Sequence, residues 1–306
     1  MWPICNMLWR IGDILPVDEQ LAWCLEAGFD GIGLHASAGH PGQWRGVDPA
    51  AASPRYRREL RRQLGPFARC EVHAPFSIVL GPGDPGSRDP GSGDPAEGAA
   101  ALEPVIAFAA DIGAAVVTAH GHLPDTCGTQ ARWLEAMGRL DACAASNGIR
   151  LGLEVVSGFD QVAAWRLPQV GVTLDVGHMY AQDEGQHLQP YGSIGDLVRA
   201  LGPSLFHLHV HDVEAAPSTP GAPLLDHLEV GVGQVDFEDL MRGLAANGYG
   251  GALCLEMNPD RVSPEGIGRS LRRLRALIHD GAGNRQNSGT GTESGAPERE
   301  QKGGGQ

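Results

Sequence analysis

The sequence predicts an α/β fold of the (β/α)8 (TIM) barrel type, and three features of the chain lead to this prediction. Apolar segments alternate with amphipathic segments over residues 1–280. The apolar segments are hydrophobic at nearly every position, which is typical of parallel strands covered by helices on both faces. Four of them follow a glycine that ends a helical segment. Because eight such units fit within about 280 residues, a closed barrel is favoured over an open sheet.

The order of the elements follows from the same signals. Glycine just past a helix adopts the left-handed conformation that caps the last carbonyls, so it marks a junction between helix and strand. The eight expected strands lie within residues 3–8, 26–35, 69–74, 110–120, 145–156, 169–176, 204–210 and 245–257. Amphipathic patterns predict helices at residues 17–27, 53–64, 100–112, 129–145, 192–201, 236–247 and 264–278, with the weakest helical pattern near 159–166.

Two segments depart from this alternation. The segment GPGDPGSRDPGSGDP (81–95) repeats Asp-Pro-Gly-Ser and has no apolar side chains to bury, so we expect a flexible insertion after the third strand. Residues 281–306 contain few apolar side chains, so we expect a disordered C-terminal tail. Residues 1–280 are then expected to form a single barrel domain.

Composition and charge limit the classes of function. Hydrophobic residues make up 42% of the 306, yet no apolar run reaches the roughly 18 residues that a membrane helix needs. The N-terminus lacks a signal-peptide pattern and the six cysteines are scattered, which is typical of a cytoplasmic protein with reduced thiols. The formal charge of −14 repels polyanions, so extended nucleic-acid binding is disfavoured.

Ionisable side chains gather at the expected ends of six consecutive strands. In a (β/α)8 barrel the C-terminal strand ends meet at one mouth, where active sites form. Any one such residue is as readily a hydrogen-bonded core group as a functional one, but burying several together is costly without a cation. Mixed imidazole and carboxylate donors suit Zn²⁺, Mn²⁺, Fe²⁺ or Co²⁺. From the third strand onward these residues are His73, His120, Glu154, Asp175 with His178, the histidines of HLHVHD (207–212), and Glu256.

These residues belong to a series of short motifs: VHAP (72–75), AHG (119–121), LGLEVV (151–156), TLDVGH (173–178), HLHVHD (207–212), DHLEVGVGQVDF (226–237) and CLEM (254–257). The series resembles that of the xylose isomerase-like TIM barrel superfamily. That superfamily contains sugar and sugar-phosphate isomerases and epimerases as well as endonuclease IV (AP endonuclease family 2). The resemblance covers essentially residues 1–280.

The resemblance implies a metal site formed by Glu154, Asp175, His209 and Glu256. In the epimerase branch the two glutamates also move the proton: one takes it from the carbon beside a carbonyl and the other returns it. The metal polarises that carbonyl and its neighbouring hydroxyl, which stabilises an enediolate. His178 is implied to contact a substrate oxygen.

The endonuclease IV branch implies a larger site. Its motifs match His73, His120, His178 and His227, which extend the cluster to further zinc ions that hold a phosphate and generate a hydroxide. The Asp-x-His pattern of that branch falls here on Leu225-Asp226-His227. Leucine therefore stands at the aspartate position, and Asp226 is displaced by one residue.

The three histidines of HLHVHD cannot all bind one ion. Alternation along a strand places His207, His209 and His211 on one face, about 6.6 Å from one to the next, whereas an imidazole–metal bond measures about 2.1 Å. The family motif selects His209 as the ligand. We expect His207 one layer deeper in the barrel, in the core or behind a ligand, and His211 beside the substrate or behind a ligand.

Two functions are consistent with these residues. The first is a divalent-metal-dependent isomerase or epimerase of a small sugar or sugar phosphate, with Trp44 and Arg45 expected in a lid over the substrate. An ordinary packed loop is an equally good interpretation of Trp44. The alternative is a metal-dependent phosphoesterase of the endonuclease IV kind. Neither function predicts a membrane partner, and a homo-oligomer is compatible with both.

Overall fold

The structure is a computed structural model, and it describes residues 1–8, 16–37, 46–81, 94–123, 127–181, 187–217 and 224–287. Its strands form one closed barrel in which each strand pairs in parallel with the next and β8 returns to β1, as predicted. The strands are β1 Ile4–Leu8, β2 Gly31–His35, β3 Arg69–His73, β4 Val116–His120, β5 Arg150–Glu154, β6 Val170–Asp175, β7 Leu205–Val210 and β8 Leu253–Leu255.

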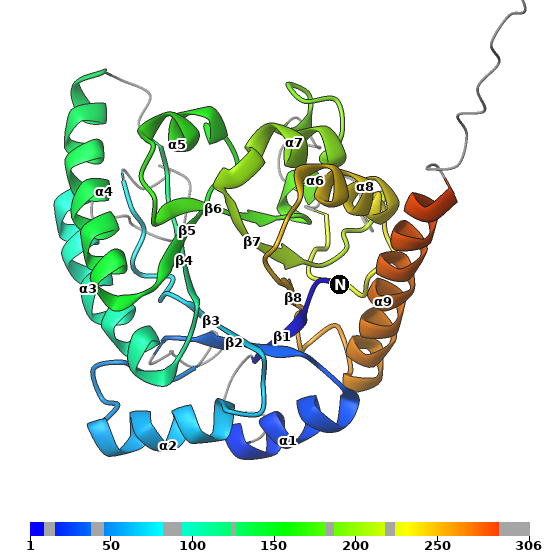
Figure 1. The fold of residues 1–306 in the computed structure, drawn as a ribbon, viewed down its shortest axis with the longest axis horizontal. Helices are drawn as coiled ribbons and strands as arrows, with labels where there is room; N and C mark the ends of the chain where they lie inside the picture. The colour runs from blue at the N-terminus through cyan, green and yellow to red at the C-terminus, as the bar shows by residue number, and fades with distance from the viewer. Residues whose placement is uncertain are drawn as a thin grey trace, which may run out of the picture.

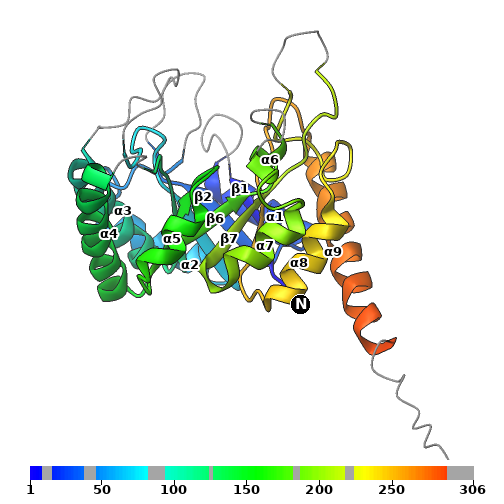
Figure 2. The same ribbon diagram turned by 90° about the horizontal axis from the view of Figure 1, so that it is seen from above.

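Helices surround this barrel, with α3 and α4 on the side opposite α9 (Figures 1 and 2). The helices are α1 Val17–Ala27, α2 Pro54–Leu64, α3 Pro95–Ile112, α4 Cys127–Asn147, α5 Phe159–Trp165, α6 His178–Ala181, α7 Ile194–Leu201, α8 Phe237–Asn247 and α9 Pro264–Asn287. The weak pattern near residues 159–166 is indeed a helix, α5. The four-residue helix α6 was not predicted. None of the described helices is long and apolar enough to cross a membrane.

Glycines end the helices where the sequence predicted junctions. Gly28, Gly113 and Gly248 follow α1, α3 and α8 in the left-handed conformation, with φ of 89°, 84° and 68°. The backbone N–H of each glycine donates to carbonyls of the last helical turn, which otherwise lack partners. This cap turns the chain back into the next strand and so repeats the helix-to-strand unit around the barrel.

Two expected boundaries differ from those observed. Helix α3 begins at Pro95, inside the segment 81–95 that was expected to be a flexible insertion, because the Asp94 side chain accepts the N–H of Ala96 and proline suits the first helical position. Residues 82–93 of that segment lie outside the described residues. Helix α9 runs to Asn287, past the barrel boundary expected at residue 280. The expected disorder of the tail is therefore a prediction for residues 288–306 only, which also lie outside the described residues.

The interior of the barrel is smaller and more polar than its outer layer. The main hydrophobic core packs helices against the outside of the strands, while Cys5, Met7, Ala252 and Cys254 form a separate small cluster. The strand register then places the predicted site residues next to one another. His120 lies opposite Glu154 on β5, and Asp175 lies opposite His209 on β7.

Candidate metal centre at the barrel mouth

Glu154, Asp175, His209 and Glu256 converge at the C-terminal ends of β5, β6, β7 and β8. Nδ1 of His209 lies 2.8 Å from Glu256 Oε2 and 3.4 Å from Glu154 Oε2. Donor atoms of Glu154, Asp175 and His209 all lie within 4.8 Å of one another, and all four side chains are buried. The structure thus brings together the four residues that the resemblance implied as one ligand set.

A carboxylate that the sequence analysis missed orients His209. Glu71 on β3 is buried, and its Oε1 lies 2.6 Å from Nε2 of His209. The two ring nitrogens therefore face opposite carboxylates, with Nε2 toward Glu71 and Nδ1 toward Glu154 and Glu256. A neutral ring that donates Nε2–H to Glu71 keeps the Nδ1 lone pair for a cation, which is the usual support of a metal-binding histidine.

Two layers of contacts hold Glu71 in place. The hydroxyl of Thr118 donates to Glu71 Oε1 over 3.0 Å, and Thr118 and Thr173 lie 2.9 Å apart through their hydroxyl oxygens. The imidazole Nε2 of His207 contacts the second oxygen, Oε2. The expectation that His207 lies deeper than His209 agrees with this placement: it contacts Glu71 beneath the ligand set.

Histidines from β3 and β4 surround Glu154. His73 Nε2 lies 3.2 Å and His120 Nε2 3.5 Å from Glu154 Oε2. The other nitrogen of His73, Nδ1, lies 2.7 Å from the carbonyl oxygen of Ala74 and must donate to it. In a neutral ring, Nε2 then presents its lone pair toward Glu154, an arrangement that a shared cation stabilises. His35, at the end of β2, stacks on His73 with ring centroids 4.6 Å apart.

A second group of donors lies at the outer edge of the cluster. Asp175, His178, His211 and His227 have donor atoms within 4.8 Å of one another. His211 is fully buried, and its Nε2 lies 2.9 Å from Asp175 Oδ1. Its Nδ1 accepts the backbone N–H of His227 over 2.9 Å. The imidazole of His211 thus contacts the side chain of Asp175 on one side and the backbone of His227 on the other. Of the two positions expected for His211, this is the one behind a metal ligand, not the one beside the substrate.

The loop after β6 passes directly against His211. A Cβ atom at Gly177 would overlap the ring of His211. Only glycine fits at position 177 of the motif TLDVGH, because any side chain there would clash with the imidazole of His211. This close approach also places His178 beside Asp175, with Nδ1 3.4 Å from Asp175 Oδ2.

Asp226 reaches the outer group despite its displacement in the sequence. Its Oδ1 lies 3.1 Å from His227 Nδ1, and its Oδ2 lies 3.9 Å from His178 Nε2. His227 has a φ of 53°, which is uncommon for a residue other than glycine. Asp226 also forms an ion pair with Arg261 at 3.0 Å, so part of its charge is already neutralised.

The cluster carries compensating charges. Burial raises the pKa of the Glu154 carboxyl, but His120, His209 and His73 outweigh burial and hold that pKa well below its ordinary value. Burial lowers the pKa of His209, yet Glu256 and Glu71 raise it well above its ordinary value. A divalent cation would have to displace a proton from the ring of His209 in order to bind.

The donor set fits a divalent metal ion. His209 Nδ1 and Asp175 Oδ2 are buried and make no hydrogen bond within the part of the chain that the structure describes. There, the ion-pair partners of Glu154, Asp175 and Glu256 are all histidines. Because the sole lysine of the chain is Lys302, outside the described residues, no described lysine could neutralise them. A cation would satisfy both the carboxylates and the ring nitrogens.

Several sequence predictions were incomplete at this site. Glu71 lies two residues before His73 on the same strand, so alternation alone places it on the inner face, where a charged residue needs a partner. His35 ends β2 in the same manner in which His73 ends β3, and the same strand-end criterion would have found it. The expected lid residues Trp44 and Arg45 lie outside the described residues.

The fold and the donor cluster define a (β/α)8 barrel protein whose mouth can hold a divalent metal. The sequence model of the family described as xylose isomerase-like TIM barrel matches residues 21–277, and the chain belongs to this family. No curated protein sequence matches the chain significantly.

Solved structures share the fold at low sequence identity. A xylose isomerase domain protein from Planctomyces limnophilus is 18% identical, with a TM-score of 0.68 over 92% of this chain and 98% of that one. An L-ribulose 3-epimerase is also 18% identical, with a TM-score of 0.67 over 96% and 100% of the two chains. The IOLI protein, solved with a zinc atom, is 15% identical, with a TM-score of 0.61 over 92% and 98%.

Proposed function

We propose that the protein is a divalent-metal-dependent isomerase or epimerase of a small sugar or sugar phosphate. The observation that carries this proposal is the placement of Glu154 and Glu256, which approach Nδ1 of His209 from two different strands. Two buried carboxylates around one metal position can hold the ion and also exchange a proton with a bound substrate. Among the described residues, no other pair of glutamates approaches Nδ1 of His209 in this way.

Similar structures support this choice of reaction. L-Ribulose 3-epimerase, D-psicose 3-epimerase solved in the presence of D-fructose, and a D-tagatose 3-epimerase-like protein share the fold over at least 90% of this chain. The zinc atom in the IOLI protein supports a bound divalent metal in this chain. Manganese, zinc, cobalt and iron all suit these donor types. A negative net charge and the reduced cysteines of a cytoplasmic protein are compatible with a small-molecule substrate.

In the proposed reaction, the two glutamates and the histidines around them have different roles. One glutamate removes a proton from the carbon next to the substrate carbonyl, and the other returns a proton, so Glu154 and Glu256 act as a base–acid pair. A bound metal would supply polarisation of that carbonyl and its neighbouring hydroxyl. His73 and His120 contact the carboxylate of Glu154, and the partly exposed His178 would contact a substrate oxygen. Trp44 and Arg45 are proposed to cover the substrate.

Proton exchange with solvent tests this reaction. If the two glutamates move the proton, turnover of the active substrate in D₂O should place deuterium on the carbon next to the carbonyl. The measurement is NMR of products from a panel of ketoses and ketose phosphates with Mn²⁺ or Zn²⁺. A substrate that is converted without incorporating any deuterium would contradict the proton-transfer model.

A second candidate function is a metal-dependent phosphoesterase of the endonuclease IV kind. The specific observation in its favour is that the mouth offers further donor groups beside the central set: His73 with His120 and Glu154, and the outer group around Asp175 and His211. Leu225 occupies the position at which the endonuclease IV pattern has aspartate. Asp226, the next residue, lies beside His227 and His178 and could partly take the place of that aspartate. The ion pair with Arg261 competes for that carboxylate and weakens this candidate.

The number of bound metal ions separates the two candidates. We expect one tightly bound ion per chain for the isomerase, because among the described residues only the central set combines three buried carboxylates with the oriented Nδ1 of His209. Mass spectrometry of the intact protein and elemental analysis after dialysis measure this ratio. Two or three zinc ions per chain, together with hydrolysis of a phosphodiester, would overturn the isomerase proposal.

A further inference from the structure

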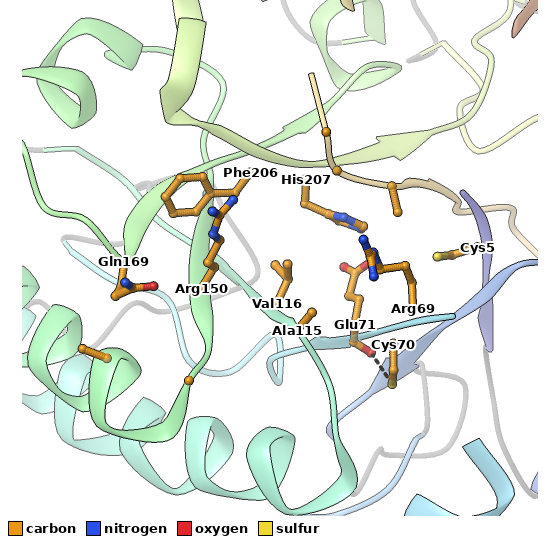
Figure 3. A pocket seen from close by; sticks show the side chains of 15 residues that line it. Cys5, Arg69, Cys70, Glu71, Ala115, Val116, Arg150, Gln169, Phe206 and His207 are labelled. Carbon is orange, nitrogen blue, oxygen red and sulfur yellow. Dashed lines mark hydrogen bonds and ion pairs between the residues drawn. The ribbon is translucent and has the colours of Figure 1, made fainter. Parts of the chain in front are cut away.

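A cavity lies at the opposite end of the barrel from the candidate metal centre. It has a volume of about 480 Å³ and is lined from the N-terminal ends of the strands, including Arg69 and Glu71 of β3 and Arg150 of β5 (Figure 3). Pockets for small ligands typically measure about 300 to 1,000 Å³. Reaction sites in this fold form at the C-terminal strand ends, so this cavity is not part of the proposed active site.

Two arginines give the cavity wall its charge. Arg150 lies over the ring of Phe206, with its guanidinium carbon 4.9 Å from the ring centroid. Arg69 donates to the adjacent carbonyl of Ala68 over 3.2 Å. Figure 3 shows the two guanidinium groups on different sides of the cavity, Arg150 near Phe206 and Arg69 near both Glu71 and His207. Within the described part of the chain, neither arginine forms an ion pair with a carboxylate.

The floor of the cavity holds one carboxylate. Glu71 contacts His207 and His209 and accepts a hydrogen bond from Thr118. The two arginines, Arg69 and Arg150, therefore outnumber the acidic side chains among the residues that line the cavity, although the chain as a whole carries −14.

We propose that this cavity binds a small organic anion that carries phosphate or carboxylate groups. A guanidinium group presents a planar fork of N–H donors that matches either group, and stacking of Arg150 on Phe206 holds that fork in place before binding. The volume suits a molecule larger than inorganic phosphate alone. Glu71 contacts both the cavity and His209, so the bound anion lies one residue away from a proposed metal ligand.

Calorimetry on the metal-loaded protein tests this site with glycerol 3-phosphate, succinate and inorganic phosphate as probes and glycerol as the uncharged control. We expect saturable binding of at least one of the charged probes, with one molecule per chain. Arg69→Gln and Arg150→Gln should each weaken it by about tenfold or more, because each removes a charged hydrogen-bond donor. Arg58→Gln, which removes an exposed arginine on α2, should leave the affinity unchanged.

Removal of the metal with a chelator distinguishes this cavity from the barrel mouth, where an anion could bind the metal. The metal-free protein should keep the anion affinity of the metal-loaded protein. The proposal is overturned if none of the three charged probes binds saturably in the millimolar range, if Arg69→Gln and Arg150→Gln bind as well as the unmodified protein, or if the metal-free protein no longer binds the anion. Since none of these outcomes depends on sugar conversion, failure here and failure of the isomerase proposal are distinguishable.

Discussion

Replacement of Glu256 by glutamine is expected to reduce kcat of the proposed isomerase by about 10²- to 10⁴-fold, the usual contribution of a general acid or base. The amide keeps an oxygen donor in the same place, 2.8 Å from His209 Nδ1 in the unmodified protein, but can no longer accept a proton. Metal should therefore remain bound at saturating concentration while turnover falls. Glu154→Gln should behave in the same manner, because Glu154 is the other member of the pair.

Two measurements separate loss of proton transfer from loss of metal. Elemental analysis should show an equal metal content in Glu256→Gln and the unmodified protein, and deuterium exchange into the substrate should fall with kcat. Glu135→Gln is a matched control, because Glu135 is an exposed carboxylate on α4, away from the cluster. If a metal-loaded Glu256→Gln variant retains kcat within about tenfold of the unmodified protein, Glu256 does not act as a general acid or base.

Removal of the Glu71 charge is expected to weaken metal binding by about 10- to 100-fold, although Glu71 is not a proposed ligand. Its carboxylate, 2.6 Å from His209 Nε2, increases the basicity of the ring and keeps Nδ1 turned toward Glu154 and Glu256. In Glu71→Gln the ring retains a hydrogen-bond acceptor but loses the adjacent negative charge. Titration of metal into the metal-free protein, followed by calorimetry, measures the change in affinity directly.

A control within the same layer of the barrel tests whether this effect is specific. Thr173→Val removes a buried hydroxyl that contacts Thr118, which in turn donates to Glu71, but no contact with His209 is lost. We expect this variant to lose stability of about 1 kcal/mol and to keep its metal affinity. If Glu71→Gln is folded and binds metal as tightly as the unmodified protein, Glu71 has no positioning role.

Most of the fold could be predicted because its signals are local. Continuous apolar runs, amphipathic stretches and glycine caps such as Gly28 and Gly113 depend on residues close in the chain, and each was found where expected. The short helix α6 was missed because its four residues carry no amphipathic pattern of their own. The start of α3 was placed too late because Asp94 and Pro95 belong to a repeated turn-like segment and also form a helix N-terminus.

The candidate site was only partly predictable. The ligand set came from motifs at strand ends, whereas the alternation of HLHVHD did not show that His207 and His209 both contact Glu71. Alternation along a single strand does not tell which residue of another strand lies opposite. Glu71 was missed for that reason, since its partners His207 and His209 are more than a hundred residues away in the sequence.

The sequence by itself determined that this chain forms eight strand–helix units and that histidines and carboxylates end most of its strands. Those ends must meet at one mouth, because parallel strands that close into a barrel all point the same way. Only the tertiary structure decided that Nδ1 of His209 faces Glu154 and Glu256, that Asp226 reaches His227, and that two arginines line a cavity at the other end. These features depend on side-chain orientation and on the register between strands distant in the chain, which no local pattern records.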